Sequence, residues 1–307
     1  MRCARSCRTP RLCGCRAATS ASWPAEPLRP CGNARSNSWG RADVTRDFIH
    51  WHGHRVCVSE LGHGQPLFLV PGIGCSADMW QPFTHYFPNR RIVSFDAPGA
   101  GRSSTPLYPV PVASVASLAA AVLDSRGIDR TDVIGFSYGG AIAQQLAYDY
   151  PERVGKLVLA ATNCGLGSLW GSPGAMAMMT TPLRFYSPTY FELVAADLYG
   201  GVTARDAARR QSASGARRRL PPSSYGYAMQ LLGGLGWSSF GFLPDIRHET
   251  LVVCGDDDPL VPIANARLLA ERIPRASLEI VERAGHLLLW DEPERIAPQI
   301  GQFVGWG

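Results

Sequence analysis

The chain has 307 residues, of which 46% are hydrophobic and 18% are charged. This length and composition are ordinary for a globular protein with a large buried core. The formal charge of +5 comes from one end, because residues 1–46 hold nine arginines against Glu26 and Asp43, a net +7, and the remainder carries −2. A nearly neutral folded part gives no support to nucleic-acid binding, and no apolar run is long enough for a transmembrane segment.

Residues 1–45 mix Arg, Ser, Pro and Gly without apolar periodicity, which predicts disorder. No apolar stretch of a secretory signal follows the basic start. We interpret this segment as an upstream extension of the coding frame, and an Arg-rich targeting arm is the alternative. Its five cysteines lack the paired spacing of a zinc site, and we expect no metal ion and no cofactor. Cys57 and Cys254 lie in strand-like runs and are expected to be buried free thiols, which fits a reducing, cytoplasmic location.

Apolar patterns after residue 45 predict strands that alternate with helices. Such alternation implies parallel βαβ units. We therefore expect an α/β fold, with a mostly parallel central sheet and helices on both faces. In chain order the patterns predict a hairpin of Phe48–Trp51 and Arg55–Val58, strands at Pro66–Val70, Arg91–Phe95, Asp132–Phe136, Lys156–Ala160, Thr250–Cys254 and Leu278–Val281, and helices at Ser114–Ser125, Ala141–Tyr148, Ile263–Ile273 and Glu294–Val304.

This alternation stops between Asn163 and Arg247. The stretch is rich in Met, Trp, Tyr, Phe and Pro and carries the basic run Arg217–Arg219. It has the character of an inserted, helical cap. The predicted organisation is therefore a core of residues 46–162 and 248–307, with a cap, or lid, of residues 163–247.

The turn after the predicted strand Asp132–Phe136 reads Gly135-Phe136-Ser137-Tyr138-Gly139. The pattern G-x-S-x-G between a strand and a helix indicates the nucleophile elbow of α/β-hydrolases, whose sharp, strained turn exposes the serine hydroxyl. The flanking glycines let strand and helix approach each other, and the helix N-terminus directs N–H groups toward charge that forms beside the serine. We predict Ser137 as the nucleophile; the alternative is a glycine-rich turn without chemistry.

The predicted base is a histidine that follows the nucleophile, since the chain order in this fold is serine, acid, histidine. Only His248 and His286 follow Ser137. His248 precedes the next apolar strand, whereas His286 lies in a loop just after the strand Leu278–Val281. A loop at that place allows an imidazole to reach the elbow, so we predict His286.

The acid should follow the strand Thr250–Cys254, where Asp256, Asp257 and Asp258 are the candidates. We predict Asp258, because it lies deepest in the loop and is fixed by the following proline. Its role would be to hold the tautomer of the histidine and to stabilise the imidazolium, without taking the proton. Asp256 and Asp257 are the alternatives, as turn or capping residues.

An oxyanion hole requires two N–H donors beside the reacting carbonyl. The backbone N–H of Tyr138, directly after the nucleophile, is one candidate. The second should come from the loop after Pro66–Val70, where we predict Ile73, with Gly72 and Gly74 giving the loop its conformational freedom.

With these motifs in place, the chain from about Arg46 to Val304 resembles α/β-hydrolases, and more narrowly the intracellular poly(3-hydroxyalkanoate) depolymerases. The Gly234–Ser239 segment, G-L-G-W-S-S, lies in the predicted cap and is the most discriminating part. The similar family has Trp where this chain has Tyr138. The similar stretches are P-G-I-G-C-S-A-D-M-W, F-D-A-P-G-A-G-R-S-S-T-P, V-I-G-F-S-Y-G-G-A-I-A-Q-Q-L-A-Y-D-Y-P-E-R, K-L-V-L-A-A-T, Q-L-L-G-G-L-G-W-S-S, G-D-D-D-P-L-V-P and the surroundings of His286.

The resemblance implies hydrolysis of ester bonds in a storage polyester or its oligomers, at a granule surface in the cytoplasm. Trp237 and Met179 of the predicted cap would then bind substrate in an apolar slot; the alternative is that they form the cap's own core. A small-molecule carboxylesterase, a lipase and a carbon–carbon bond hydrolase remain open, and so does a non-catalytic ligand-binding protein. The serine at the elbow argues against dehalogenase and epoxide-hydrolase relatives, which use aspartate there.

Overall fold

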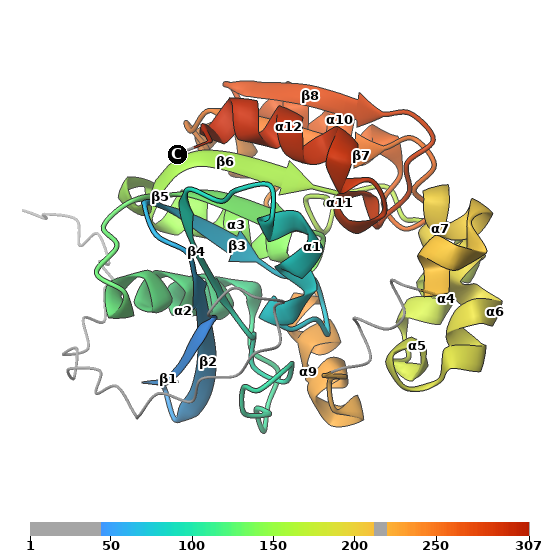
Figure 1. Ribbon diagram of the computed structural model, residues 1–307, viewed down its shortest axis with the longest axis horizontal. Helices are drawn as coiled ribbons and strands as arrows, with labels where there is room; N and C mark the ends of the chain where they lie inside the picture. Colours follow the sequence, from blue (N-terminus) through green and yellow to red (C-terminus); the bar gives the residue numbers. More distant parts are fainter. Residues whose placement is uncertain (1–43, 212–219, 307) are drawn as a thin grey trace, which may run out of the picture.

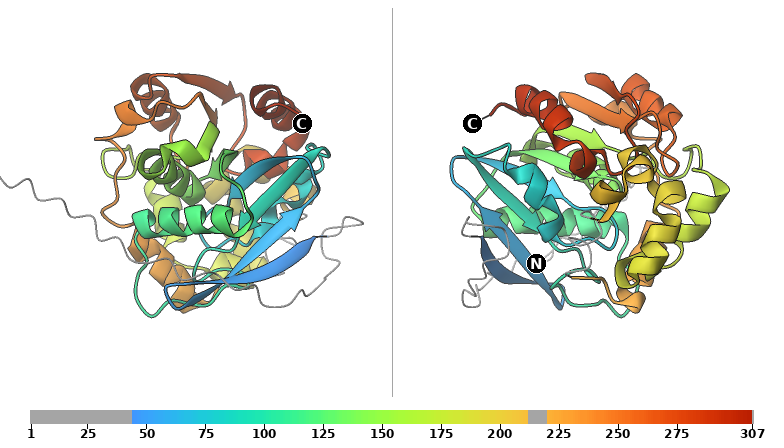
Figure 2. Two further views of the ribbon diagram at one scale, coloured as in Figure 1. Left: turned by 90° about the vertical axis from the view of Figure 1, so that its left-hand side faces the viewer. Right: turned by 45° about the vertical axis from the view of Figure 1, so that its right-hand side comes forward.

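A computed structural model describes residues 44–211 and 220–306. The described chain forms one eight-stranded sheet with helices on both faces (Figures 1 and 2). The strands are β1 (Thr45–Trp51), β2 (His54–Leu61), β3 (Gln65–Val70), β4 (Arg90–Phe95), β5 (Thr131–Phe136), β6 (Val154–Ala160), β7 (Thr250–Gly255) and β8 (Ala276–Val281).

The strand order is β1-β2-β4-β3-β5-β6-β7-β8. The first two strands form the predicted hairpin, which turns at His52 and Gly53, both with positive φ, and β2 is antiparallel to β4. All pairs from β4 and β3 to β7 and β8 are parallel. The predicted, mostly parallel sheet is thus confirmed, and the carboxyl ends of β3 to β8 meet at one edge.

The helices outside the predicted cap include each helix that the sequence predicts, with ends that differ by at most three residues. The differences lie at the helix ends, where assignments commonly vary by one or two residues. These helices are α1 (Gln81–Thr84), α2 (Val112–Ser125), α3 (Tyr138–Asp149), α10 (Ile263–Arg272), α11 (Leu288–Asp291) and α12 (Pro293–Val304).

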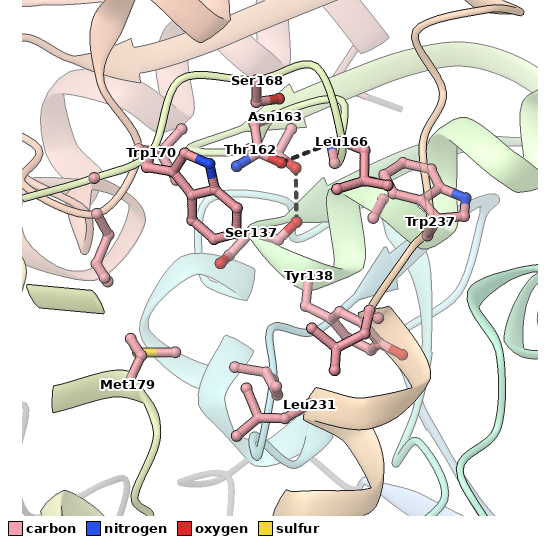
Figure 3. A pocket seen from close by; sticks show the side chains of 18 of the residues that line it. Ser137, Tyr138, Thr162, Asn163, Leu166, Ser168, Trp170, Met179, Leu231 and Trp237 are labelled. Atoms are coloured by element: carbon pink, nitrogen blue, oxygen red, sulfur yellow. Dashed lines mark hydrogen bonds between the residues drawn. The ribbon is translucent and has the colours of Figure 1, made fainter. Parts of the chain in front are cut away.

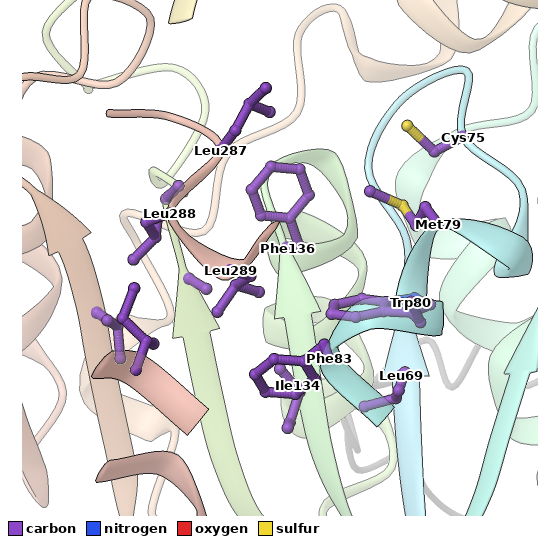
Figure 4. Close-up of a cluster of buried hydrophobic side chains, with 14 of the residues drawn as sticks. Leu69, Cys75, Met79, Trp80, Phe83, Ile134, Phe136, Leu287, Leu288 and Leu289 are labelled. Carbon is purple, nitrogen blue, oxygen red and sulfur yellow. The ribbon is translucent and has the colours of Figure 1, made fainter. Parts of the chain in front are cut away.

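Two apolar clusters pack on the two faces of the sheet, because successive side chains of a strand point to opposite sides. In β3, Leu67 and Leu69 pack on the face covered by α1, α11 and α12, whereas Phe68 and Val70 pack on the face covered by α2, α3 and α10. Figure 4 shows part of the first cluster, in which Phe136 at the end of β5 lies between Leu287 and Met79. Strands buried on both faces explain the nearly continuous apolar runs of the sequence.

Between β6 and β7 the chain forms short helices in place of a single crossover. They are α4 (Pro173–Met179), α5 (Leu183–Tyr186), α6 (Pro188–Tyr199), α7 (Gly201–Arg205) and α9 (Ser224–Gly234). Figure 1 shows α4 to α7 gathered beyond the carboxyl ends of the strands, and α9 as a separate helix below them. The basic run Arg217–Arg219 lies outside the described residues, as do residues 1–43 of the predicted N-terminal extension.

Two sequence-based expectations concern the rest of the described chain. Cys57 and Cys254 are buried and free, as predicted, and burial raises the pKa of both thiols to about 12. At neutral pH these thiols are therefore protonated. Within residues 44–211 and 220–306, no helix combines the length and the hydropathy that crossing a bilayer requires.

Candidate active site

Ser137 stands in a strained turn between β5 and α3, with φ +52° and ψ −118°. Close packing imposes this turn. A Cβ atom on Gly139 would lie 2.1 Å from the carbonyl oxygen of Val70, and one on Gly135 would lie 2.5 Å from the carbonyl oxygen of Gly139. Only glycine fits at these two positions of the G-x-S-x-G pattern, which explains the motif in steric terms.

His286 connects Ser137 to Asp258 through hydrogen bonds at both ring nitrogens. Its Nε2 lies 3.1 Å from Ser137 Oγ, and its Nδ1 lies 2.8 Å from Asp258 Oδ2. With the proton on Nδ1 donated to the carboxylate, Nε2 is free to accept the serine hydroxyl proton. The three side chains come from loops after β5, β7 and β8, whose carboxyl ends meet at the same edge of the sheet.

The Asp258 carboxylate is completely buried, and its second oxygen is occupied as well. Oδ1 accepts hydrogen bonds from the backbone N–H groups of Leu260 at 2.8 Å and Val261 at 2.9 Å. These bonds fix the carboxylate toward the histidine and stabilise its negative charge. The Asp258 side chain is 0% exposed, so water does not compete with the imidazole for its carboxylate.

The two neighbouring aspartates have other partners. Asp256 accepts a hydrogen bond from the backbone N–H of Arg283. Asp257 accepts from the N–H of Gly201 at 3.0 Å and from the guanidinium of Arg205 at 2.7 Å. Of the three candidate acids, the structure therefore brings Asp258 alone to the imidazole, while Asp257 ties the β7 loop to α7.

The imidazole of His286 contacts two aromatic rings. The centroid of Phe136 lies 5.2 Å from it, and Tyr199, at the end of α6, is nearly parallel to it at 6.3 Å. The backbone N–H of His286 also donates to the carbonyl oxygen of Tyr199 at 2.7 Å. The segment between β6 and β7 thus takes part in orienting the histidine. His248, the other histidine after Ser137, lies elsewhere and contacts the carbonyl oxygen of Pro151.

Ile73 and Tyr138, the two predicted oxyanion donors, lie beside Ser137 and line one cavity with it. No backbone or side-chain acceptor within the described part of the chain takes a hydrogen bond from either N–H group. Tyr138 is the first residue of α3, where N–H groups point out of the helix without a helical partner. Both amides are therefore available to a ligand atom beside the serine.

Two residues that sequence reasoning did not single out hold the backbone around the serine. Thr162 Oγ1 donates to the carbonyl oxygen of Ser137 at 2.7 Å. Gln230 of α9 accepts from the N–H of Gly74 at 2.8 Å and donates to the carbonyl oxygen of Pro98 at 2.9 Å. Thr162 ends the stretch K-L-V-L-A-A-T, and Gln230 begins the stretch Q-L-L-G-G-L-G-W-S-S. Both stretches carry the family resemblance, which could have pointed to these two residues but did not indicate what they do.

A mainly apolar cavity of about 280 Å³ opens above Ser137. In Figure 3, Met179 and Leu231 lie on one side of Ser137 and Trp237 on another, with Trp170 nearby. The structure thus places both predicted substrate-binding residues, Trp237 and Met179, in the wall of this cavity. The indole N–H of Trp237 donates to Gln145 Oε1 at 2.7 Å, which fixes its ring in that wall.

Comparison with known proteins places this geometry in a family. Residues 65–293 match the model of the alpha/beta hydrolase fold family. The chain therefore belongs to the alpha/beta hydrolase fold family, and the fold predicted from the sequence is confirmed.

Among curated relatives, the chain is 43% identical over 244 residues to a poly(3-hydroxyalkanoate) depolymerase of Ectopseudomonas oleovorans. The aligned region covers 79% of this chain and 85% of the relative. It is 28% identical over 284 residues to a 2-hydroxymuconate semialdehyde hydrolase of Pseudomonas sp. (strain CF600), with 89% of this chain and 96% of the relative covered. A solved hydrolase from Pseudomonas aeruginosa PA01 has a TM-score of 0.72 at 23% identity, over 87% of this chain and 99% of that one. At this level of identity, the similarity to the solved structure shows a shared fold and nothing more.

Proposed function

We propose that the chain is a serine hydrolase that cleaves ester bonds of poly(3-hydroxyalkanoate) storage polyester or its oligomers. The observation that carries the proposal is the hydrogen-bonded series Asp258–His286–Ser137 at the floor of an apolar cavity. The 43% identity to a poly(3-hydroxyalkanoate) depolymerase supports this substrate class. In this proposal Ser137 is the nucleophile, His286 the base and Asp258 the acid.

Acylation would begin when the oxygen of Ser137 attacks the ester carbonyl carbon. His286 Nε2 takes the serine proton and then gives it to the alkoxide oxygen of the leaving alcohol. Asp258 stabilises the imidazolium formed between these two steps, and its buried carboxylate keeps the ring in the required tautomer. A water molecule, activated by the same nitrogen, then releases the acid and restores the serine.

The negative charge on the carbonyl oxygen would be stabilised by the N–H groups of Ile73 and Tyr138. Preorganised donors of this kind need no rearrangement when the charge appears, and each contributes about 10²–10³-fold to turnover. The position of Ile73, Ser137 and Tyr138 in the wall of one cavity supports this assignment.

We also propose that residues 163–247 act as a cap over a core of residues 46–162 and 248–307. The exposed side chains at the cavity mouth support contact with a polyester surface. Trp170 is 72% exposed and Leu235 is 69% exposed, and both also line the cavity, as do the exposed Leu166 and Leu169. An apolar rim continuous with an apolar cavity suits an insoluble, apolar substrate. The cytoplasmic, granule-associated location predicted from the sequence is part of this proposal.

A second candidate is a carbon–carbon bond hydrolase, which the 28% identity to a 2-hydroxymuconate semialdehyde hydrolase favours. The same three residues serve such a reaction, so the substrate decides between the candidates. A generic carboxylesterase or lipase uses them as well. A non-catalytic ligand-binding role is the least consistent with hydrogen bonds at both nitrogens of His286.

The test is hydrolysis of short- and medium-side-chain poly(3-hydroxyalkanoate), beside p-nitrophenyl esters and a semialdehyde ring-cleavage product. We expect turnover of the polyester and labelling of Ser137 by a fluorophosphonate. If Ser137 is labelled but only the p-nitrophenyl esters are hydrolysed, the protein is a generic esterase. Turnover of the ring-cleavage product alone would establish the second candidate, and absence of both labelling and turnover would leave a binding protein.

A further inference from the structure

Arg184 of α5 is a buried cation beside the candidate active site. It is 3% exposed. Its Nε donates to the hydroxyl of Tyr199, one Nη to the hydroxyl of Tyr227, each at 2.9 Å, and the other Nη to the carbonyl oxygen of Thr181, also at 2.9 Å. The guanidinium also lies over the rings of Phe185 and Tyr227. These contacts hold the group in one orientation.

No carboxylate pairs with this guanidinium among the residues that the structure describes, whereas the two other buried arginines there, Arg46 and Arg90, pair with Asp78 and Asp132. The neighbouring Tyr227 does not supply an anion, since burial raises the pKa of its hydroxyl, which donates to the carbonyl oxygen of Met179. A buried guanidinium stays charged, and burying an uncompensated charge is costly. Of its five N–H groups, three have the acceptors named above.

Arg184 faces a small cavity that also contacts the candidate catalytic residues. This cavity measures about 20 Å³, and its wall includes Ser137, His286 and Arg184. A volume of roughly 10–15 Å³ is enough for one water-sized group. Ile73, Ser137 and Met179 line both this cavity and the large apolar one, so the two are lobes that meet at the serine.

From this arrangement we infer that Arg184 binds a carboxylate on the leaving-alcohol side of the ester, which for a 3-hydroxyalkanoate oligomer is its free carboxyl terminus. The inference rests on the proposed function. The acyl part of the chain then occupies the large apolar lobe, and the terminal carboxylate enters the small one. A guanidinium with free N–H groups matches a carboxylate in charge and in geometry.

The chemistry of the substrate fits this placement. In a 3-hydroxyalkanoate ester, two carbon atoms separate the ester oxygen from the carboxylate carbon, so only the last ester bond brings a carboxylate this close to the attacked carbonyl. Ser137 attacks that carbonyl, the ester C–O bond breaks, and the alkoxide of the terminal unit receives the proton from His286. The terminal unit leaves as a free 3-hydroxy acid, and water then releases the shortened chain, which ends in a new carboxylate. The inference therefore predicts cleavage of single units from the carboxyl end.

The experiment compares a trimer of 3-hydroxyalkanoate that has a free carboxyl terminus with the same trimer as its methyl ester. The two substrates carry the same internal ester bonds, and the methyl ester lacks the terminal charge. Because the methyl ester is itself an additional ester, kcat/KM is taken from cleavage of the internal bonds alone. We expect kcat/KM to be about 10- to 100-fold higher for the free acid, the usual size of a charge-assisted hydrogen bond in an enclosed site. We also expect monomer to be the first product.

The variant Arg184→Gln, which keeps donors but removes the charge, should bring the free-acid to methyl-ester ratio close to one. Arg184→Lys should restore part of the ratio, because it restores the charge without the planar fork. The matched control is Arg209→Gln in the same segment, at a side chain that is 48% exposed and pairs with Glu294. It should leave the ratio as in the wild type.

Equal kcat/KM values for the two wild-type substrates would overturn the inference while leaving the polyester activity intact, and this comparison needs no variant to fold. A folded Arg184→Gln protein that keeps the wild-type ratio would also overturn it. Hydrolysis of neither trimer, beside turnover of p-nitrophenyl esters, would overturn the proposed function and with it this inference.

Discussion

The loops at the carboxyl edge of the sheet and the segment between β6 and β7 place their polar side chains in different ways. In the loops, backbone geometry places the side chain: a strained turn holds Ser137, and two N–H groups hold Asp258. In the segment, a side chain holds the backbone of the loops that follow β3 and β4: Gln230 binds the N–H of Gly74 and the carbonyl oxygen of Pro98.

This difference separates reactivity from recognition. The strand-end loops carry Ser137 and His286, to which the segment adds the contacts of Tyr199 with the histidine, and the fold gives no substrate by itself. The cavity walls, by contrast, come largely from the segment, including Met179, Leu231 and Trp237. The comparison predicts that changes at the loops affect all substrates alike, whereas changes in the segment affect substrates differently.

The largest effect is expected for Ser137→Ala. Removal of the proposed nucleophile should prevent formation of the acyl-enzyme and lower kcat by about 10⁴-fold or more on every ester. Circular dichroism should show an intact fold, because alanine fits the site of serine. Near-wild-type turnover of this variant would show that another residue is the nucleophile.

The next largest effect is expected for Asp258→Asn. An amide at this position lets the imidazole adopt the wrong tautomer, which costs about 10³–10⁴-fold in kcat in comparable sites. Asp256→Asn is the matched control, since Asp256 lies in the same loop as Asp258 and its carboxylate contacts the N–H of Arg283 after β8. If steady-state kinetics showed as large a loss of kcat for the Asp256 variant as for the Asp258 variant, Asp256 would be the catalytic acid.

A smaller loss is expected for Gln230→Met, which keeps the length of the side chain but loses the amide. The loop that carries Ile73 is then no longer held through Gly74, and kcat should fall about 10-fold, less than removal of an oxyanion donor costs. Because the residue acts through the loop, KM for a short ester should change little. Gln299→Met on the exposed side of α12 is the control. Equal changes in kcat and KM, or none, would assign Gln230 a packing role only.

The smallest effect, and the one that separates the two regions most sharply, concerns acyl-chain length. Each additional methylene buried in the cavity should raise kcat/KM by up to about fourfold, from about 0.8 kcal/mol per CH₂. Trp237→Ala and Met179→Ala should alter this length dependence more than they alter turnover of an acetate ester. Phe242→Ala is the control, because this ring stacks on Tyr148 outside the cavity wall. Profiles that differ from wild type only by a constant factor would show that the segment does not recognise the acyl chain.

Much of the sheet could be predicted because its signals are local. The apolar run at Leu67–Val70 is buried on both faces of the sheet, and the G-x-S-x-G pattern needs no distant contact to be recognised. Chain order then left His248 and His286, and the position of His286 just after the last predicted strand decided between them. The choice of Asp258 over Asp256 was harder, since all three aspartates follow β7 and only tertiary contacts distinguish them.

The segment between β6 and β7 could be predicted only in outline. Its helices are short, and α5 has only four residues, Leu183–Tyr186, so periodicity gives little information. The contacts of Arg184 with Tyr199 and Tyr227 span 15 and 43 residues of sequence, which no local pattern encodes. Trp237 and Met179 were selected as apolar residues in the right region, but their position in the cavity wall depends on how α4 and α9 pack.

The positive φ of Ser137 restricts which amino acids can replace it during evolution. Serine, threonine and cysteine all carry a side chain that can form an acyl-enzyme. At φ +52° a β-branched side chain meets the backbone more severely than an unbranched one, so threonine is disfavoured there although its hydroxyl is chemically equivalent. Cysteine has the same branching as serine and fits the same turn. Among residues that can form an acyl-enzyme, this backbone torsion thus favours two nucleophiles, an alcohol and a thiol. The second would exchange a hard attacking atom for a soft one without any change in the surrounding sheet.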